Sequence, residues 1–371
     1  MKEKIKVLQI GMSGNQGGIE TYIYNLYKNS NKDEFQFDFI DISNDKIAFY
    51  DELVSDGANI YKVIGRDKNY FEHISQLKNI IKKNNYNIIH IHIMDYSWFE
   101  PIVIASKYSK AKIILHSHSA NNVMTWNQKH KMLHKIGKWL CKNVKAEHVA
   151  CGKKAGEFMF PNQIFTILNN GIDLDKFKYN YQYNEELRKE LKIAEKSFII
   201  GQVAKLDLPK NPLFLLEIFN EYKKKDINAK LVVVGEGPQK KEMEEKIKEY
   251  NLGQDVFLLG RRDDCYKIYS MFDLFLMPSL YEGFSISLVE AQANGLKCYT
   301  SDEVDEDSNI TGNVQFISLE KNAGFWADQI LNSKNERDRN AQEKIPDKFD
   351  FKNSYEMVYE VYRSGVENEN N

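Results

Sequence analysis

The chain has 371 residues, of which 42% are apolar, and this size fits two or three domains with substantial hydrophobic cores. Its formal net charge of −2 excludes a global electrostatic bias toward nucleic acid or toward a strongly acidic partner. Four cysteines without CxxC spacing argue against a disulfide framework, and no apolar run approaches the ~20 residues of a membrane span. We therefore expect a cytoplasmic protein that has no transmembrane segment.

The first strand, expected over residues 6–10, runs into a glycine-rich loop. Four glycines stand between Gly11 and Gly18, and a helical pattern follows from Ile19. Backbone N–H groups in such a strand–loop–helix unit can bind a phosphate, which makes Gly17 and Gly18 candidate contacts. The loop has neither Walker nor GxGxxG spacing, so a plain tight turn is the alternative interpretation.

Apolar runs and helical patterns then alternate, which predicts the βαβ units of a parallel sheet. The expected strands cover residues 35–42, 58–64, 88–93 and 112–115, and a helix is expected over 71–83. Two histidine pairs stand where strands end: His90 with His92, and His116 with His118. A period of two places each pair on one strand face. Two such pairs suggest a metal site, but no carboxylate or cysteine completes the ligand spacing, so we expect ordinary buried or rim histidines.

Residues 126–145 form a basic, amphipathic segment. Its lysines are Lys129, Lys131, Lys135, Lys138, Lys142 and Lys145, and its apolar residues are Trp126, Leu133, Ile136, Trp139 and Leu140. A helix of this kind can lie on an anionic membrane surface. It can equally present a solvated lysine face above a stripe of core residues, and the sequence leaves both interpretations open.

The middle of the chain contains an expected hinge. Asp173-Leu-Asp175 has the spacing of a metal-binding carboxylate pair, but we interpret it as turn chemistry because it stands in this hinge. The polar residues 180–196 mark the domain boundary, and a buried strand follows over 197–204. Lys205 and Lys210 come next, in a strand-to-helix loop. Two lysines at this spacing can hold a diphosphate as point charges, although surface lysines are the common alternative.

The stretch Pro278–Gly295 joins an expected strand over 273–277 to a helical pattern that begins at Ser287. A helix N-terminus carries a partial charge of about +0.5 and unpaired N–H groups, so a phosphate binds well there. Phosphate repels a carboxylate, and we therefore interpret Glu282 in the preceding loop as an acceptor for sugar hydroxyls. Glu290 has a second interpretation, because Ser287 and Glu290 have the spacing of a capping box.

Within Pro278–Gly295, two glutamates, Glu282 and Glu290, are separated by seven residues. This pattern resembles the signature of the family 4 retaining glycosyltransferases. This resemblance implies the GT-B fold, in which two Rossmann-like α/β domains have parallel sheets that face each other across a cleft. In that family the first glutamate faces the donor sugar and the second holds the ribose hydroxyls. The resemblance covers nearly the whole chain and is strongest over residues 205–295.

The resemblance assigns a site residue by residue. It implies catalytic roles for Glu282 and for His116, with His118 as the second choice. The implied donor-binding residues are Gly17, Gly18, Lys205, Lys210, Arg261, Glu282, Gly283, Phe284, Ser285, Ile286, Ser287 and Glu290. The chain departs from the family pattern at Lys205, where an arginine is usual and its bidentate fork is lost. Ser285 and Ser287 replace a commoner glycine and proline.

We therefore expect an N-terminal acceptor domain over residues 1–178, a donor-binding domain over 179–351, and a helix near 352–366 that crosses back to the first domain. The expected activity is metal-independent, retaining transfer of a sugar from a nucleotide-diphosphate sugar, with UDP as the expected nucleotide. The expected acceptor is a glycan of cell-surface polysaccharide biosynthesis, lipid-linked if residues 126–145 contact the inner face of the cell membrane. We expect no cofactor and no nucleic-acid partner. Two rivals remain: a nucleotide-sugar 2-epimerase of the same architecture, and a non-catalytic subunit that binds a nucleotide sugar.

Overall fold

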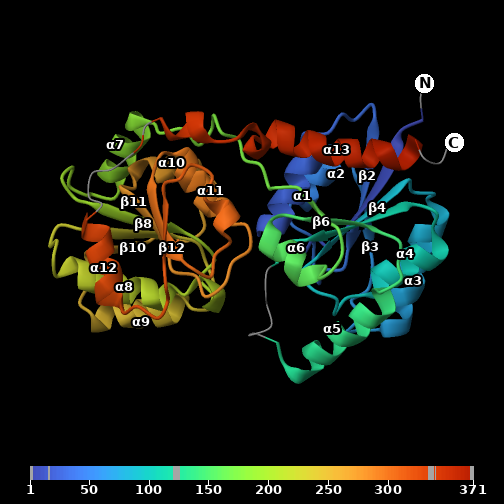
Figure 1. The fold of residues 1–371 in the computed structure, drawn as a ribbon, viewed down its shortest axis with the longest axis horizontal. Coiled ribbons are helices and arrows are strands. Elements are labelled where there is room, and N and C mark those ends of the chain that lie inside the picture. The colour runs from blue at the N-terminus through green and yellow to red at the C-terminus, as the bar shows by residue number, and fades with distance from the viewer. Residues whose placement is uncertain (1–2, 16, 120–125, 333–337, 339, 368–371) are drawn as a thin grey trace. The chain divides into compact units, whose positions relative to one another are not determined.

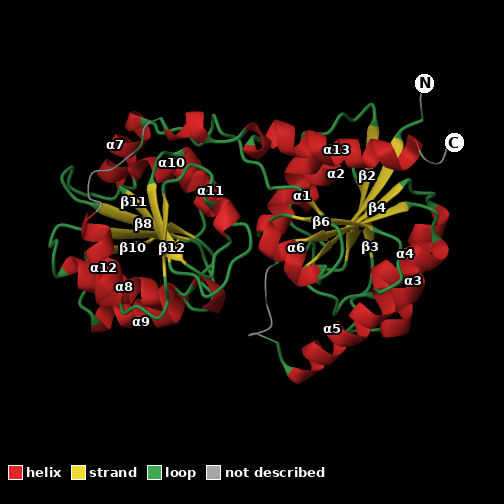
Figure 2. Ribbon diagram, in the orientation of Figure 1, coloured by secondary structure: helices red, strands yellow, loops and turns green. Residues whose placement is uncertain are grey.

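The computed structural model describes residues 3–15, 17–119, 126–332, 338 and 340–367. The chain divides into two compact units (Figure 1). Unit 1 comprises residues 1–171 and 352–371, and unit 2 comprises residues 172–351. Each unit contains one parallel sheet with helices on both faces (Figure 2). The predicted pair of Rossmann-like α/β domains is confirmed.

The sheet of unit 1 has seven strands in the order β3-β2-β1-β4-β5-β6-β7. These are β1 Ile5–Ile10, β2 Phe35–Asp41, β3 Asn59–Lys62, β4 Ile88–Ile93, β5 Lys112–Ser117, β6 Glu147–Ala150 and β7 Thr166–Ile167. The helices are α1 Gly18–Lys28, α2 Tyr50–Ser55, α3 Tyr70–Lys83, α4 Glu100–Tyr108, α5 Gln128–Cys141, α6 Lys153–Met159 and α13 Phe351–Glu367. The strand order reverses between β1 and β4, and ligands of open parallel sheets bind at the carboxyl end of such a switch point.

Helix α13 packs on unit 1 through a stripe of tyrosines. Tyr355, Tyr359 and Tyr362 recur at helical spacing and are buried. The hydroxyl of Tyr359 donates to the Leu26 carbonyl of α1 at 2.6 Å. Helix α13 is thereby fixed against the face of the sheet that also carries α1.

The sheet of unit 2 has six strands in the order β10-β9-β8-β11-β12-β13. These are β8 Ile199–Val203, β9 Lys230–Val234, β10 Val256–Leu258, β11 Leu274–Met277, β12 Lys297–Ser301 and β13 Val314–Ile317. The helices are α7 Tyr181–Glu190, α8 Pro212–Lys223, α9 Lys240–Glu249, α10 Cys265–Met271, α11 Ile286–Ala293 and α12 Ala323–Asn332. One core lies between the sheet and α8, α9 and α12, and a second lies between the sheet and α7, α10 and α11.

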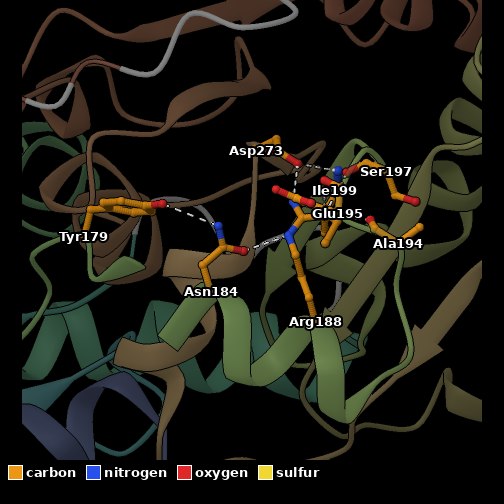
Figure 3. Close-up of polar contacts among 8 residues, drawn as sticks. All are labelled: Tyr179, Asn184, Arg188, Ala194, Glu195, Ser197, Ile199 and Asp273. Carbon is orange, nitrogen blue, oxygen red and sulfur yellow. Dashed lines mark hydrogen bonds and ion pairs between the residues drawn. The ribbon is translucent and has the colours of Figure 1, made fainter. Parts of the chain in front are cut away.

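The polar residues 180–196, expected to be only a boundary, contain α7. Arg188 of this helix is buried and bridges three segments (Figure 3). Its guanidinium donates to the Ser197 carbonyl at 2.9 Å and to Asp273 at 3.0 Å. Asp273, just before β11, also accepts the backbone N–H of Ile199 in β8. One arginine therefore fixes the boundary helix against the starts of the two central strands.

We expect Arg188→Ala to lower the free energy of unfolding of unit 2 by about 2–4 kcal/mol. The substitution leaves a partly buried carboxylate and several carbonyls without their donor. Urea unfolding followed by Trp326 fluorescence measures this change once the three tryptophans of unit 1 are replaced by phenylalanine. The neighbouring exposed Lys189→Ala is the control, and an equal small effect of both substitutions would contradict the bridging role of Arg188.

Candidate active site

In unit 2 the loops that follow β8, β9, β10 and β11 form one connected edge. The N–H of Leu206 donates to the Glu236 carbonyl at 3.0 Å, and the N–H of Leu280 donates to the Pro209 carbonyl at 2.8 Å. Gly235 has φ +139°, and a Cβ there would lie 1.9 Å from the Ala204 carbonyl oxygen. Only glycine permits this approach. The edge is thus a pre-formed surface at the carboxyl ends of parallel strands.

Lys210 and Glu282 meet at this edge. Lys210 ends a 3₁₀ turn, Leu208–Lys210, after β8, and its ammonium forms an ion pair with the Glu282 carboxylate in the loop after β11. Both side chains are largely shielded from solvent. Burial lowers the pKa of Lys210 to about 8, so the ammonium still predominates at neutral pH. The structure therefore brings together Lys210, which is predicted to contact a diphosphate, and Glu282, which is predicted to contact a sugar.

The other two cations of the predicted donor site are more exposed. Lys205 is exposed and lies 3.4 Å from Asp207, in the same loop as Lys210. Arg261 is also exposed, and its guanidinium lies 3.5 Å from Asp263. Neither joins the ion pair of Lys210 and Glu282, and both are available to a ligand that reaches the edge.

The N-terminus of α11 lies in the same loop region as Glu282. Ser285 is its N-cap residue without a side-chain cap, and its own N–H donates to the hydroxyl of Ser308 at 3.3 Å. The next N–H groups, of Ile286 and Ser287, have no acceptor within the part of the chain that the structure describes. The ring of Phe284 stacks on Phe349, which supports the turn into the helix. Unpaired N–H groups at a helix start suit an anion.

Glu290 does not cap α11, so the capping-box interpretation is wrong. It lies in the second turn, and its carboxylate accepts the hydroxyl of Tyr269 from α10 at 2.7 Å. Burial raises the pKa of Glu290 to about 7, while the Tyr269 hydrogen bond acts in the opposite direction. Glu290 is therefore a shielded carboxyl group that ionises near neutral pH.

In unit 1 the four histidines gather at the carboxyl ends of β4 and β5. His90 Nε2 lies 3.2 Å from His116 Nδ1, and His92 Nδ1 lies 2.8 Å from His118 Nε2. His116 is fully buried, whereas His118 is partly exposed. Nitrogens of His90, His92 and His116 lie within 4.8 Å of one another, a spacing from which a metal site could form. These nitrogens already hydrogen-bond to one another or to neighbouring side chains, except for Nε2 of His116.

The glycine-rich loop after β1 carries a carboxylate of its own. Gly17 is the N-cap of α1, and its N–H donates to Glu20 at 3.1 Å. The other oxygen of Glu20 accepts the N–H and hydroxyl of Ser13. A phosphate at Gly17 would have to displace Glu20, whereas Gly18 begins the helix beside it.

Helix α5 covers most of the basic segment, and its apolar side chains are not core residues. Trp139 is 74% exposed, and Met132, Ile136 and Leu140 are also exposed. The helix packs instead through Gly137 and Cys141, and a Cβ at Gly137 would lie 2.0 Å from the Tyr96 carbonyl oxygen. The interpretation of a core stripe beneath solvated lysines is therefore wrong.

Comparison with known proteins agrees with this geometry. Residues 16–176 match the family model "Glycosyltransferase Family 4", and residues 184–344 match "Glycosyl transferases group 1". A putative glycosyltransferase EpsF of Bacillus subtilis is 34% identical over 336 residues, which cover 88% of this chain and 86% of that protein. The chain belongs to glycosyltransferase family 4.

Two further matches are to a protein of named activity and to a protein of known structure. An Escherichia coli UDP-Gal:alpha-D-GlcNAc-diphosphoundecaprenol alpha-1,3-galactosyltransferase is 26% identical over 259 residues, which cover 66% of this chain and 63% of that enzyme. The crystal structure of Anabaena HepE in complex with UDP and glucose matches with a TM-score of 0.81 at 17% identity. It covers 97% of this chain and all of that one, and it shows the GT-B fold.

Sequence reasoning missed several partners of the site residues. Tyr269 was not connected with Glu290. The histidines were not connected with Gln9, whose amide oxygen lies 2.8 Å from His92 Nε2, or with Tyr362, whose hydroxyl lies 2.7 Å from His90 Nδ1. A tyrosine stripe at helical spacing in the last helix was visible in the sequence, but its contacts depend on the sheet against which it packs. The glycosyltransferase therefore contains polar networks that its motifs do not reveal.

Proposed function

We propose that this glycosyltransferase transfers a sugar from a UDP-sugar to a lipid-linked glycan, with retention at the anomeric carbon. The observation that carries the proposal is the ion pair of Lys210 and Glu282 beside the unpaired N–H groups of α11. A cation and a helix N-terminus suit a leaving diphosphate, and a carboxylate suits a sugar hydroxyl. The relative that uses UDP-Gal and a diphosphoundecaprenol-linked acceptor supports the choice of donor and acceptor.

The proposed mechanism is electrostatic. As the bond between the sugar and the diphosphate breaks, negative charge grows on the leaving oxygen, and Lys210 with the N–H groups of Ile286 and Ser287 stabilises it. Glu282 and Lys210 hold each other in place before the donor arrives, so little reorganisation is needed at the moment of reaction. Because these groups supply positive charge, we propose that the reaction needs no metal ion and no cofactor.

A thermal-shift screen of nucleotide sugars tests this function. A ligand that binds only the folded protein raises its stability by RT ln(1 + [L]/Kd), so UDP-sugars should raise the melting temperature, and UDP should do so too. Incubation of the stabilising donor with lipid-linked acceptors, followed by mass spectrometry, should yield a product one sugar heavier. If no nucleotide sugar stabilises the protein, the proposal fails.

The epimerase alternative is not favoured, because the relatives reported above are transferases. Incubation with the donor alone discriminates between the two, since only an epimerase converts the donor sugar without an acceptor. A non-catalytic subunit would bind the donor but give no product with any acceptor, and Glu282→Ala would then leave the output of its pathway intact.

Donor affinity should depend on the ionisation of Glu290, for which we propose contact with the ribose hydroxyls. The pKa of Glu290 is about 7, so affinity should rise as the pH increases from 6 to 8. Tyr269→Phe removes a hydrogen bond that favours the carboxylate, so it should move the midpoint of this rise to higher pH. Titration calorimetry with UDP at several pH values measures the shift.

The control is Tyr266→Phe, on the same helix α10 but without a bond to Glu290.

The free energy of unfolding gives an independent measurement, and the sign of its pH dependence is defined. Because the pKa of Glu290 is raised on folding, its favourable contribution to folding is present below its ordinary pKa and is lost as the pH rises through about 7. If the pH profile of UDP affinity were the same in wild type and Tyr269→Phe, the proposed role of Glu290 would be contradicted.

We propose that the glycosyltransferase acts at the inner face of the cell membrane, with α5 as the contact. No helix among the described residues combines the length and apolarity needed to cross a bilayer. Exposed apolar side chains and lysines nevertheless share α5, and Lys135, Lys138, Trp139 and Lys142 line a pocket of about 400 Å³ with Met159 and Pro161. This combination suits an anionic lipid surface.

A further inference from the structure

Helix α5 lies at the margin of unit 1 (Figure 1), and contacts in its N-terminal half hold it in place. His130 Nε2 lies 2.9 Å from Asp95, and the backbone N–H of Tyr96 donates to His134 Nδ1 at 3.2 Å. The ring of Trp126 lies against both histidine rings, with centroid distances of 4.8 and 4.7 Å. These contacts fix the helix on the loop after β4, so the surface of its second half is formed before a ligand arrives.

The second half of α5 lines a pocket of about 400 Å³ together with residues from the end of α6 to β7. Trp139 lines it from α5, and Met159, Pro161 and Gln163 line it from the other segment. This volume is within the usual range of small-molecule sites, and such sites combine an apolar lining with a few polar groups. The pocket is therefore large enough for a phosphate-bearing headgroup and the first carbons attached to it.

The charged groups of the pocket are cations. Lys135, Lys138 and Lys142 line it from α5, and none of the three forms an ion pair with a described residue. Among the described residues that line it, none is an aspartate or a glutamate. Burial lowers the pKa of His148, which also lines the pocket, so its ring is neutral at physiological pH. Three lysines that no described acid neutralises suit an anion with several oxygens, such as a phosphate.

The rim of the pocket is apolar and exposed. Ile164, which follows Gln163 in the chain, is 96% exposed. Ile136 and Leu140 of α5 are also exposed. A free phosphate gains nothing from such a rim, whereas a phospholipid can place its phosphate among the lysines and its chains on the apolar side chains. The combination therefore favours an amphiphile over a soluble anion.

We infer that this pocket binds the headgroup of one anionic phospholipid, with Lys135, Lys138 and Lys142 around the phosphate and the chains on the apolar rim. The inference rests on the membrane contact proposed above and makes it specific, because one lipid occupies a defined site in addition to the diffuse attraction between a basic helix and an anionic surface. The described residues of the lining include neither the four histidines nor the glycine-rich loop, so we assign the pocket to a membrane lipid and not to the acceptor.

Short-chain lipids below their critical micelle concentration test the pocket without a bilayer. Spectra of the full chain, ¹⁵N-labelled at tryptophan, report the indole of Trp139 in the pocket and that of the buried Trp326 in unit 2 as a reference. Dihexanoyl phosphatidylglycerol should shift the Trp139 signal to saturation and leave Trp326 unchanged, and native mass spectrometry should show one lipid per chain. Dihexanoyl phosphatidylcholine, which lacks net charge, and inorganic phosphate, which lacks chains, should each bind at least about tenfold more weakly.

Two lysine pairs of α5 separate a pocket from diffuse charge. Lys138→Ala with Lys142→Ala should weaken binding of dihexanoyl phosphatidylglycerol roughly tenfold to thirtyfold, because both lysines line the pocket. Lys129→Ala with Lys131→Ala removes the same charge from the same helix outside the pocket and should leave this binding unchanged. Both pairs should weaken binding to phosphatidylglycerol vesicles. Equal effects of the two pairs on the short-chain lipid would overturn the inference.

A bulky side chain in the pocket tests its shape without a change of charge. Gln163 is exposed, so Gln163→Trp should preserve the fold while it fills the pocket and weakens binding of the short-chain lipid. Gln128→Trp, at an exposed position at the start of α5, is the matched control. Equal binding by these two variants, or displacement of the phospholipid by farnesyl diphosphate at lower concentration, would show that the assignment to a phospholipid is wrong.

The binding measurements use neither donor nor acceptor, so they separate the pocket from the proposed function. Vesicle binding without binding of the short-chain lipid would contradict the pocket and leave α5 as a diffuse membrane contact. Binding of the short-chain lipid by a protein that transfers no sugar would support the pocket and contradict the proposed function.

Discussion

Lys210→Ala should lower kcat by about a hundredfold to a thousandfold, the cost of removing one preorganised group that stabilises developing charge. Lys210 is held by Glu282 at the edge where α11 begins, and it is the most shielded of the three cations predicted to bind the donor. In the proposed site its ammonium meets the diphosphate with little competition from water, so its electrostatic effect should be large. Steady-state kinetics with the donor identified by thermal shift measure the change.

The exposed Lys248→Ala on α9 is the matched control and should leave kcat unchanged. Lys205→Ala should have a smaller effect than Lys210→Ala, because the Lys205 side chain is 62% exposed and water screens its charge. Since Lys210→Ala leaves the Glu282 carboxylate without its partner, the double variant with Glu282→Gln shows how much of the loss comes from that carboxylate. If Lys210→Ala and Lys248→Ala had the same kcat, the proposed mechanism would be wrong.

The fold could be predicted from the sequence because each buried parallel strand corresponds to a short run of apolar residues. Most predicted strands agree with the structure within a few residues, as at Ile88–Ile93 and Lys112–Ser117. The segment around Arg188 could not be predicted. Helix α7 is almost entirely polar, so it lacks the apolar stripe that predicts a packed helix. It is held by the buried Arg188, whose partner Asp273 is distant in the sequence and comes beside it only in the folded chain.

The donor edge was predictable in part for a similar reason. Lys210 and Glu282 stand in loops that follow strands, and parallel strands bring such loops to one edge. The partner of Glu290 was not predictable. Ser287 and Glu290 have the spacing of a capping box, which suggested a local partner, and nothing in the sequence near Tyr269 indicates that it contacts Glu290. The network from Gln9 to Tyr362 joins residues that are 353 positions apart, so no periodicity or spacing could reveal it.

Replacing Ile136 and Trp139 of α5 together by serine should weaken binding to anionic phospholipid vesicles by about one to two orders of magnitude. Full burial of a large apolar side chain contributes about 2 kcal/mol, and an interfacial helix buries only part of each. The lysines of α5 should add about 1 kcal/mol each near an anionic surface, so binding should also weaken as salt is raised. Vesicle sedimentation with phosphatidylglycerol at several salt concentrations measures both effects.

The matched control is Phe71→Ser, which removes another highly exposed aromatic side chain, from α3 of the same unit. It should bind vesicles like the wild type, because Phe71 is not part of the basic helix. Activity with a water-soluble acceptor analogue should be unchanged in the α5 variant, while activity on the vesicle-bound acceptor should fall with vesicle binding. Equal vesicle binding by the α5 variant and the Phe71 control would show that α5 is not the membrane contact. That result would not contradict the proposed donor site in unit 2.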